Sequence, residues 1–204
     1  CAANLARHAD RIVTRFATAV ASLERHGDLW LLRAADGSVI AEAPQVVLAA
    51  GAQVGRLVPE RLLPVWPGRG TVSLLPAGDL PALDTARECV VCRLGYVTPA
   101  LDGIRCAGAT MARDFDPAPR IDDHIENLHR LDMILPGYAR TLDPARLPGR
   151  TSFRPMSPDR LPLAGALPPA SDLPADGLHV LSGFGARGLV WATLAAELLA
   201  SCIA

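Results

Sequence analysis

The stretch Leu178-His-Val-Leu-Ser182, continued by Gly183-Phe-Gly-Ala-Arg-Gly188 and an apolar run from Leu189 to Ala204, decides the fold. It predicts a short strand, a glycine turn and a buried helix. Three glycines let a backbone approach a ligand closely, and a helix N-terminus directs free N–H groups and a positive dipole end at that ligand. We therefore expect something anionic or electron-rich at this turn. The GxGxxG spacing alone is weak evidence, and a tight turn into a core helix explains it equally well.

A second strand with a glycine at its end precedes this unit. The run Gln45-Val-Val-Leu-Ala-Ala50 is apolar throughout and stops at Gly51, which is typical of a strand buried on both faces. Doubly wound sheets hold nucleotides at such strand ends, although a simple strand terminator is the alternative reading. Upstream, the turn pair Asp36-Gly37 between the apolar segments 28–33 and 39–41 predicts a β-hairpin.

The middle of the chain predicts a different layer. Prolines interrupt residues 55–76, which we expect to be a connection. Short apolar runs between Thr71 and Thr110, among them Glu88 to Val97 and Gly103 to Thr110, predict antiparallel strands. A helix capped by Asp122 and Asp123 should follow, with His124 and His129 on its surface. Its apolar residues at helical spacing are Ile121, Ile125, Leu128, Leu131 and Leu135.

Composition excludes several classes of protein. The chain has 204 residues, half of them hydrophobic, and a formal net charge of -1, so no overall field attracts nucleic acid or anionic membranes. Five cysteines, an odd number without a secretory signal, argue against a disulfide framework and favour a reducing cytoplasm. Cys89 and Cys92 form a CxxC without a second Cys or His pair, so we predict no metal site. The last apolar run, interrupted by Glu197, is too short to predict a membrane span.

The segment Ser152-Phe-Arg-Pro-Met-Ser-Pro-Asp-Arg-Leu-Pro-Leu-Ala-Gly165 is rich in proline and is expected to be a loop that presents side chains. Arg154, braced by Phe153 and Pro155, suits a guanidinium that grips a carboxylate, whereas a solvated arginine is the plainer alternative.

Five segments in this order resemble the superfamily of glycine oxidase, sarcosine oxidase and D-amino-acid oxidase over nearly the whole chain. Within it, the chain is most similar to the oxidoreductase half of bifunctional enzymes that modify the wobble uridine of tRNA. The segments are Val46-Val-Leu-Ala-Ala-Gly-Ala52, Leu63-Pro-Val-Trp-Pro-Gly-Arg-Gly70, Gly95-Tyr-Val-Thr-Pro99, Phe153-Arg-Pro-Met-Ser-Pro-Asp-Arg-Leu-Pro162 and Gly183-Phe-Gly-Ala-Arg-Gly-Leu189.

The resemblance implies FAD as cofactor and oxidation of a C–N bond next to a carboxylate. It implies that Arg154 and Arg187 are catalytic, and that Tyr96 and Arg154 bind substrate. A packed core tyrosine would explain Tyr96 equally well. The positions that match the family's flavin contacts are Gly51, Ala52, Gly183, Phe184, Gly185, Ala186, Gly188 and Leu189.

The implied fold class is α/β, of mixed α+β character in this chain. It comprises an incomplete FAD-binding layer and an antiparallel substrate domain, without the family's N-terminal Rossmann βαβ unit. The implied division is a partial FAD-binding domain over residues 1–62, a cap domain over 63–150 and a return to the FAD-binding domain over 151–204. Because both chain ends fall inside helical patterns, we expect a fragment. Since the missing unit holds the ADP half of FAD in this family, we expect the fragment alone to bind FAD weakly or not at all.

The resemblance further implies the substrate and partners. The wobble base 5-carboxymethylaminomethyl-2-thiouridine of tRNA would lose its carboxymethyl group as glyoxylate, and a linked N-terminal methyltransferase domain would methylate the amine. Five arginines between Arg140 and Arg160 form a possible phosphate-contacting edge, although such runs are usually a solvated face. Two other functions remain open: a small-molecule enzyme such as a D-amino-acid dehydrogenase or glycine oxidase, and a non-catalytic binding domain.

Overall fold

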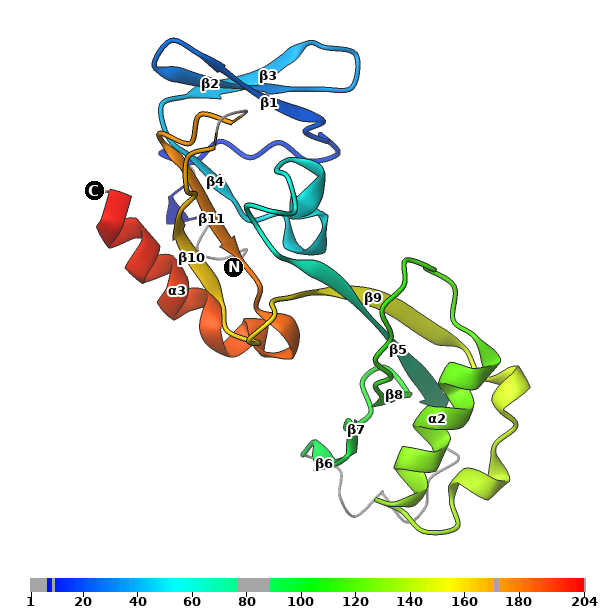
Figure 1. Ribbon diagram of the computed structural model, residues 1–204. Helices are drawn as coiled ribbons and strands as arrows, with labels where there is room; N and C mark the ends of the chain where they lie inside the picture. The colour runs from blue at the N-terminus through cyan, green and yellow to red at the C-terminus, as the bar shows by residue number, and fades with distance from the viewer. Residues whose placement is uncertain (1–6, 9, 77–88, 171–172, 204) are drawn as a thin grey trace.

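The computed structural model describes residues 7–8, 10–76, 89–170 and 173–203. Helices and strands are mixed, and Figure 1 shows two lobes linked by the paired strands β5 (Trp66–Pro76) and β9 (Gly149–Met156). The first lobe holds two three-stranded sheets and the C-terminal helix. The second lobe holds the far ends of β5 and β9, three short strands and one amphipathic helix.

The first lobe begins with an antiparallel sheet of β1 (Ser22–His26), β2 (Leu29–Arg33) and β3 (Val39–Ala43). The predicted hairpin is confirmed as β2 and β3. Strand β1 was not predicted, because Leu23 is the only apolar residue among its five and the segment has no apolar alternation. Trp30 of β2 is fully buried, and its indole N–H donates a hydrogen bond to the backbone oxygen of Asp176, 2.8 Å away.

The second sheet of this lobe has the order β10 (Leu163–Ala166), β11 (Leu178–Ser182), β4 (Val46–Leu48). Strands β4 and β11 are parallel, so their carboxyl ends lie at the same edge. Helix α3 (Gly188–Ile203) follows β11, as predicted. The 3-10 helix η1 (Gly51–Arg56) follows β4.

Two burial predictions for this lobe are wrong. Val47 of β4 is 42% exposed, so that strand is buried on one face. In α3 only Ala195 and Leu199 are buried, and Leu189 is fully exposed, because the described part of the chain packs against one side of the helix. Length and composition alone would let Gly185–Ile203 cross a membrane, a criterion that core helices of soluble proteins also meet.

The second lobe is a five-stranded antiparallel sheet in the order β6 (Val91–Arg93), β7 (Gly95–Val97), β8 (Ile104–Gly108), β5, β9. This confirms the predicted antiparallel strands, although Glu88 lies outside the described residues. Helix α2 (Ile121–Asp132) covers one face of the sheet (Figure 1). The core between them consists of Leu75, Val97, Ala107, Leu128 and Leu131. The 3-10 turns η4 (Ala139–Thr141) and η5 (Pro144–Arg146) then lead into β9.

Two segments that were predicted to be irregular are strands. Residues 66–76 form β5, not a connection, and the segment around Arg154 belongs to β9, not to a loop. Pro67 stands opposite Pro155 in the register, while β8 pairs with β5 only from Val72 onward. Since proline removes a ladder donor, it is tolerated where a neighbouring strand is absent.

Helix α2 is confirmed, but its buried face differs from the predicted one. Ile121 and Ile125 are about half exposed, whereas Asp123, His124 and Asn127 are buried with Leu128 and Leu131. The prediction that His124 lies on the surface is therefore wrong. The helix also ends at Asp132 and does not reach Leu135; the Asp132 carboxylate accepts a hydrogen bond from the N–H of Gly137.

Candidate functional site

The two glycine-containing turns of the first lobe lie at the same edge of a sheet. Parallel pairing of β4 with β11 places Gly51 and Gly183 after adjacent strand ends. The hydroxyl of Ser182, which is 1% exposed, donates a hydrogen bond to the backbone oxygen of Gly51, 3.2 Å away. The two turns are 131 residues apart in the sequence, so it is the fold that brings the two predicted cofactor-contacting segments together.

The second turn has the open backbone expected of a ligand cradle. Gly183 and Gly185 have φ values of +75° and +55°, which disfavour any residue with a side chain. Residues 185–187 form the 3-10 turn η6, and α3 begins at Gly188, so the first N–H groups of the helix lie at the turn. Of the other predicted contacts here, Phe184 is half-buried, while Ala186 and Leu189 are exposed.

Arg187 lies next to the segment after β9. Its Nη2 donates a hydrogen bond to the backbone oxygen of Arg160, 3.0 Å away. Its side chain therefore holds the glycine turn against residues 156–160.

Met156, which sequence reasoning did not single out, connects the glycine turn to the second lobe. It forms an isolated β-bridge with Phe184, and a Cβ placed on Gly185 would lie 3.4 Å from its sulfur. On its other side, a Cβ placed on Gly68 of β5 would come within 2.6 Å of Met156 Cγ. The thioether thus packs against both glycines.

Arg154 lies two residues before Met156 and on the same face of β9. Its guanidinium crosses the backbone of Gly70, where a Cβ would come within 2.0 Å of Nη1. That Nη1 is buried and has no hydrogen-bond partner among the described residues. A buried unpaired guanidinium N–H is costly, so the atom is suited to an anionic ligand.

Tyr96 stands on the same face as Arg154. The register Tyr96↔Gly108 and Gly108↔Val72 places its side chain on the side of the sheet where Gly68 and Gly70 point. Burial raises the pKa of Tyr96, and the positive charge of Arg154 opposes that rise. The tyrosine and the arginine are therefore close enough to interact electrostatically on the face opposite α2.

Gly68 and Gly70 are the sequence signal for this face. Glycines two apart in a strand point to the same side, and glycine in a strand interior often marks a close approach of backbone or ligand. Gly68 and Gly70 are not among the predicted site residues, because the sequence predicts strands only from Thr71 onward.

The opposite face of β5 carries a buried ion pair. Arg69, which is fully buried, donates two hydrogen bonds to the Asp123 carboxylate of α2, at 2.8 and 2.7 Å. The hydroxyls of Thr71 and Thr110 also donate to Asp123, at 3.1 and 3.2 Å. This network fixes α2 on the sheet and thereby fixes the strand that carries Gly68 and Gly70.

Two pKa values in this network are shifted. Burial opposes ionisation of Asp123, but hydrogen bonds from Arg69 and from the backbone N–H of Arg120 outweigh it and hold the pKa of the carboxyl well below its usual range. Burial lowers the pKa of His124, although Asp123 acts in the opposite direction. His124 Nδ1 lies 2.8 Å from the hydroxyl of Ser73. These groups support the sheet from the side away from Arg154.

A flavin cofactor fits the residues present. Its ring could lie against the backbone of these two turns, since a Cβ on Gly51 would meet no atom within 4 Å and the first N–H groups of α3 lie at the second turn. Ala52, in η1, is half-buried beside the first turn. Arg154 and Tyr96 then face the same region from the second lobe. No cluster of three His, Cys, Asp or Glu side chains that could hold a metal occurs among the described residues, and Cys89, Cys92, Cys106 and Cys202 are free.

Comparisons with known proteins agree with this geometry. The family model "FAD dependent oxidoreductase" matches residues 1–202. The bifunctional protein MnmC of tRNA 5-methylaminomethyl-2-thiouridine biosynthesis from Aromatoleum aromaticum is 50% identical over 215 residues, covering 100% of this chain and 33% of the relative. The same protein from Azoarcus sp. is 49% identical over 98% of this chain. The chain thus spans about a third of the length of these curated relatives.

Solved structures show the same fold. Iminodiacetate oxidase from Chelativorans sp. BNC1 has a TM-score of 0.68 and 27% identity, covering 91% of this chain and 48% of that one. Glycine oxidase from Geobacillus kaustophilus has a TM-score of 0.67, with 23% identity over 90% of this chain and 47% of its own. The predicted cofactor, FAD, and the predicted oxidoreductase class are confirmed at the level of the family. The chain belongs to the family of FAD-dependent oxidoreductases.

Proposed function

We propose that this chain is the substrate-binding and flavin-contacting part of an enzyme that oxidises an N-carboxymethyl amine. The modified uridine of tRNA, 5-carboxymethylaminomethyl-2-thiouridine, is the proposed substrate, and glyoxylate is the proposed product. The observation that carries the proposal is the buried Nη1 of Arg154, which has no hydrogen-bond partner in the described part of the chain. It lies on the sheet face that leads through Met156 to the glycine turn.

The comparisons support the class of substrate from two directions. The relatives named for tRNA 5-methylaminomethyl-2-thiouridine biosynthesis are up to 50% identical to the chain. Iminodiacetate, after which one of the structurally similar oxidases is named, is a secondary amine that carries carboxymethyl groups. The proposed nucleoside carries the same –NH–CH2–COO⁻ arm, so one arginine placed for its carboxylate serves both molecules.

The residues have separate roles in this proposal. Arg154 binds the carboxylate of the arm, and Tyr96 lines the pocket beside it. Arg187 holds the glycine turn in place through Arg160. Gly51, Ala52 and the segment 183–189 hold the flavin, with the N-terminus of α3 facing it.

When bound, FAD would supply the two-electron acceptor for a hydride from the carbon between the nitrogen and the carboxylate. The arm becomes an iminium, to which water adds; the C–N bond then breaks, leaving an aminomethyl group on the uridine and releasing glyoxylate. The chain's own contribution is to orient the arm and to neutralise its carboxylate. A methyltransferase domain in the same protein would then methylate the amine.

The proposal includes three structural expectations. We propose that residues 1–62 and 151–204 belong to the FAD-binding domain and that residues 63–150 form the cap domain. The Rossmann βαβ unit that holds the ADP half of FAD is proposed to lie outside this chain, against the exposed side of β4 and α3. The protein is proposed to act in the cytoplasm, where tRNA is available.

A second function is favoured by the likeness to iminodiacetate oxidase: oxidation of a free N-carboxymethyl amine without tRNA. One experiment separates the two. The full-length, FAD-loaded protein is mixed anaerobically with carboxymethylaminomethyl-modified tRNA, with iminodiacetate or with glycine. Flavin bleaching near 450 nm and glyoxylate are measured. Reaction with the tRNA at micromolar concentration supports the first function, and reaction only with the small amines supports the second.

A further inference from the structure

A groove at the junction of the two lobes gathers aromatic and cationic side chains. Its volume is about 480 Å³, and it runs between η1 and the loop after β8. The chain has only three Trp, two Tyr and four Phe, yet Trp66, Phe115 and Phe153 all line this groove. Arg56 and Arg113 lie on its walls, with Glu60 as the acidic lining residue.

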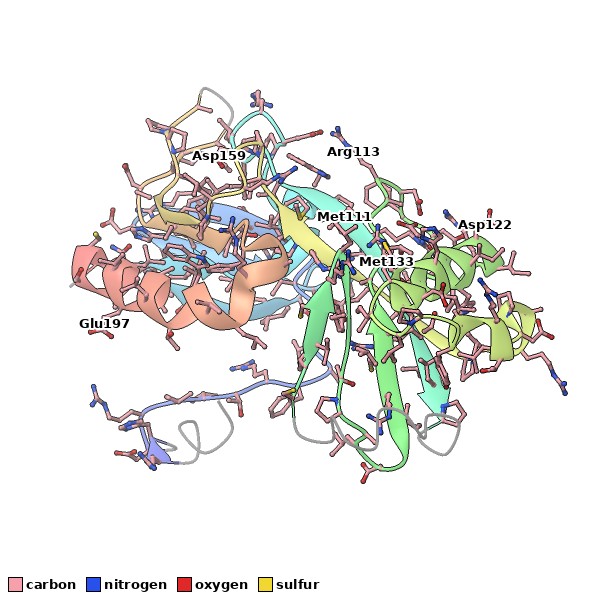
Figure 2. The ribbon with its side chains drawn as sticks, turned by 90° about the horizontal axis from the view of Figure 1, so that it is seen from below. Met111, Arg113, Asp122, Met133, Asp159 and Glu197 are labelled. Atoms are coloured by element: carbon pink, nitrogen blue, oxygen red, sulfur yellow. The ribbon has the colours of Figure 1, made fainter. Side chains whose placement is uncertain are left out.

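Arg113 and Trp66 form a stacked pair on one wall. The guanidinium carbon of Arg113 lies 5.0 Å from the centre of the Trp66 ring. Both arginines of the groove are exposed, and neither forms an ion pair with another described residue. Figure 2 shows Arg113 at the outer rim of the junction and Met111 deeper between the lobes.

The loop that presents these residues is held rigidly. Asp114 and Asp116 both form ion pairs with Arg120, and Asp114 also lies 3.4 Å from Arg69. Their carboxylates are thus engaged on one side of the loop, while Arg113 and Phe115, which alternate with them, line the groove. Phe115 is 77% exposed, so its ring is available to a ligand without rearrangement.

The groove is continuous with the proposed active site. A neighbouring cavity of about 340 Å³ is also lined by Trp66 and Arg113, and it extends to Gly68 and Met156. Met156 contacts the glycine turn, as described above. A ligand in the groove would therefore lie beside a substrate whose arm reaches Arg154.

The exposed ring of Phe115 and the Arg113–Trp66 stack, beside arginines that form no ion pair with another described residue, match the chemistry of single-stranded RNA. Unpaired bases stack on aromatic side chains and on guanidinium planes, and arginines contact the phosphates. We propose that this groove binds a nucleotide adjacent to the modified uridine, with its base against Phe115 or the Arg113–Trp66 stack and its phosphate near Arg56 or Arg113. This inference rests on the proposed function, in which the substrate is tRNA.

The test compares two substrates in the full-length, FAD-loaded protein. The variants are Phe115→Ala and Arg113→Gln, with Phe16→Ala (84% exposed) and Arg11→Gln (exposed, before β1) as matched controls. Flavin reduction is measured anaerobically with an anticodon stem-loop that carries the modified uridine, and with the free modified nucleoside. Flavin content is checked from the absorbance near 450 nm.

We expect the half-saturating concentration of the stem-loop to rise about 5- to 150-fold in Phe115→Ala, the range of a lost base–aromatic stack. The maximal rate, the reaction with the nucleoside and both controls should be unchanged. Arg113→Gln should also reduce the slope of log affinity against log salt by about 1.

Equal half-saturation by the stem-loop in wild type and in both variants would overturn the inference while leaving the tRNA function intact. A parallel loss with the free nucleoside would also overturn it, because the groove would then act on the arm or on the flavin. If the wild type oxidises the nucleoside but is not saturated by the stem-loop at any concentration, the tRNA function and this inference fail together.

Discussion

The hydroxyl of Ser182 donates a hydrogen bond to the backbone oxygen of Gly51, joining two turns that are 131 residues apart in the sequence. Both residues stand at the carboxyl ends of parallel strands, where the proposed flavin site lies.

Ser182→Ala should weaken retention of FAD without unfolding the protein. The change leaves the part-buried backbone oxygen of Gly51 without this partner, at a cost of about 0.5 to 1.5 kcal/mol, and loosens one turn relative to the other. Flavin content after gel filtration is the measurement. Ser201→Ala is the control, since its hydroxyl also bonds a backbone oxygen but lies on the exposed side of α3. Equal flavin loss in both variants would argue against the role of Ser182.

Gly185→Val should abolish flavin retention. At φ +55° a β-branched residue is strained, and its Cβ would lie 3.4 Å from the sulfur of Met156, so the turn proposed to hold the flavin would have to shift. Gly37→Val is the matched control, because Gly37 has φ +83° in the β2–β3 turn with open space around it. The control should lose stability but keep FAD. Normal flavin content in Gly185→Val would show that the turn faces something else.

Arg154→Ala should disable oxidation while flavin stays bound. Loss of a charge-assisted, largely desolvated partner costs roughly 2 to 5 kcal/mol, or about 30-fold to several thousandfold in kcat/KM. Arg154→Lys should recover little, since an ammonium cannot reproduce a planar two-pronged contact. The measurement is anaerobic flavin reduction by the modified tRNA.

Arg150→Ala is the control for Arg154, because Arg150 lies on the same face of β9 and is exposed. Equal reduction rates in the Arg154 variants and the wild type would remove this residue from the site. The carboxylate role would then pass to Arg187.

Asp123→Asn should destabilise the second lobe strongly. The change leaves the fully buried Arg69 charge without its carboxylate, and breaking such a pair costs about 3 to 5 kcal/mol. The measurement is the denaturant midpoint of the full-length protein. Asp122→Asn is the control, since Asp122 is the exposed neighbour in the same helical turn. A midpoint equal to that of the control would show that the ion pair contributes nothing to stability.

Acid should destabilise the protein partly through His124. Its pKa is lowered by burial, so the folded state favours the neutral imidazole, and the unfolded chain takes up the proton first as pH falls through about 6.5. The contribution of neutral His124 to stability is therefore complete above that pH and declines below it. The decline ends once the pH has fallen below the pKa of His124 in the folded state. His124→Leu should flatten the fall of Tm between about pH 8 and pH 5.5, whereas His129→Leu, on the exposed side of α2, should not. An unchanged pH profile in His124→Leu would contradict this assignment.

The units with local signals were predicted from the sequence. The hairpin of β2 and β3, the strand–turn–helix at β11 and α3, and the helix α2 all depend on neighbouring residues, through turn chemistry or helical spacing. Strands β5 and β9 were missed over Trp66–Gly70 and around Arg154 because proline dominates the local pattern. Only the pairing of Pro67 with Pro155, 88 residues apart, shows that the prolines stand where no ladder bond is lost.

Parts of the site were likewise beyond local reasoning. Arg154 and the glycine turn were proposed from their residues and from the resemblance, and their roles remain predictions. Met156 could not be found in this way, because its significance lies in contacts with Gly68 and Gly185, which are distant in sequence. The burial of His124 depends on Ser73 and Gly149, which a helical pattern cannot reveal.

Alternate residues of strand β5 have two separate roles. Gly68 and Gly70 leave room for Met156 and Arg154 on one face, while Arg69 and Thr71 bind Asp123 on the other. A one-residue shift in the pairing of β5 with its neighbours would turn every side chain to the opposite face. A slip of β5 that disrupted the anchoring of α2 would therefore also bring Arg69 and Thr71 under Arg154 in place of the two glycines. Insertions in the loops at the ends of β5 and β9 would leave the pairing of the strands unchanged. An insertion within the strands would remove both the ion pair that stabilises the second lobe and the site proposed to bind the carboxylate.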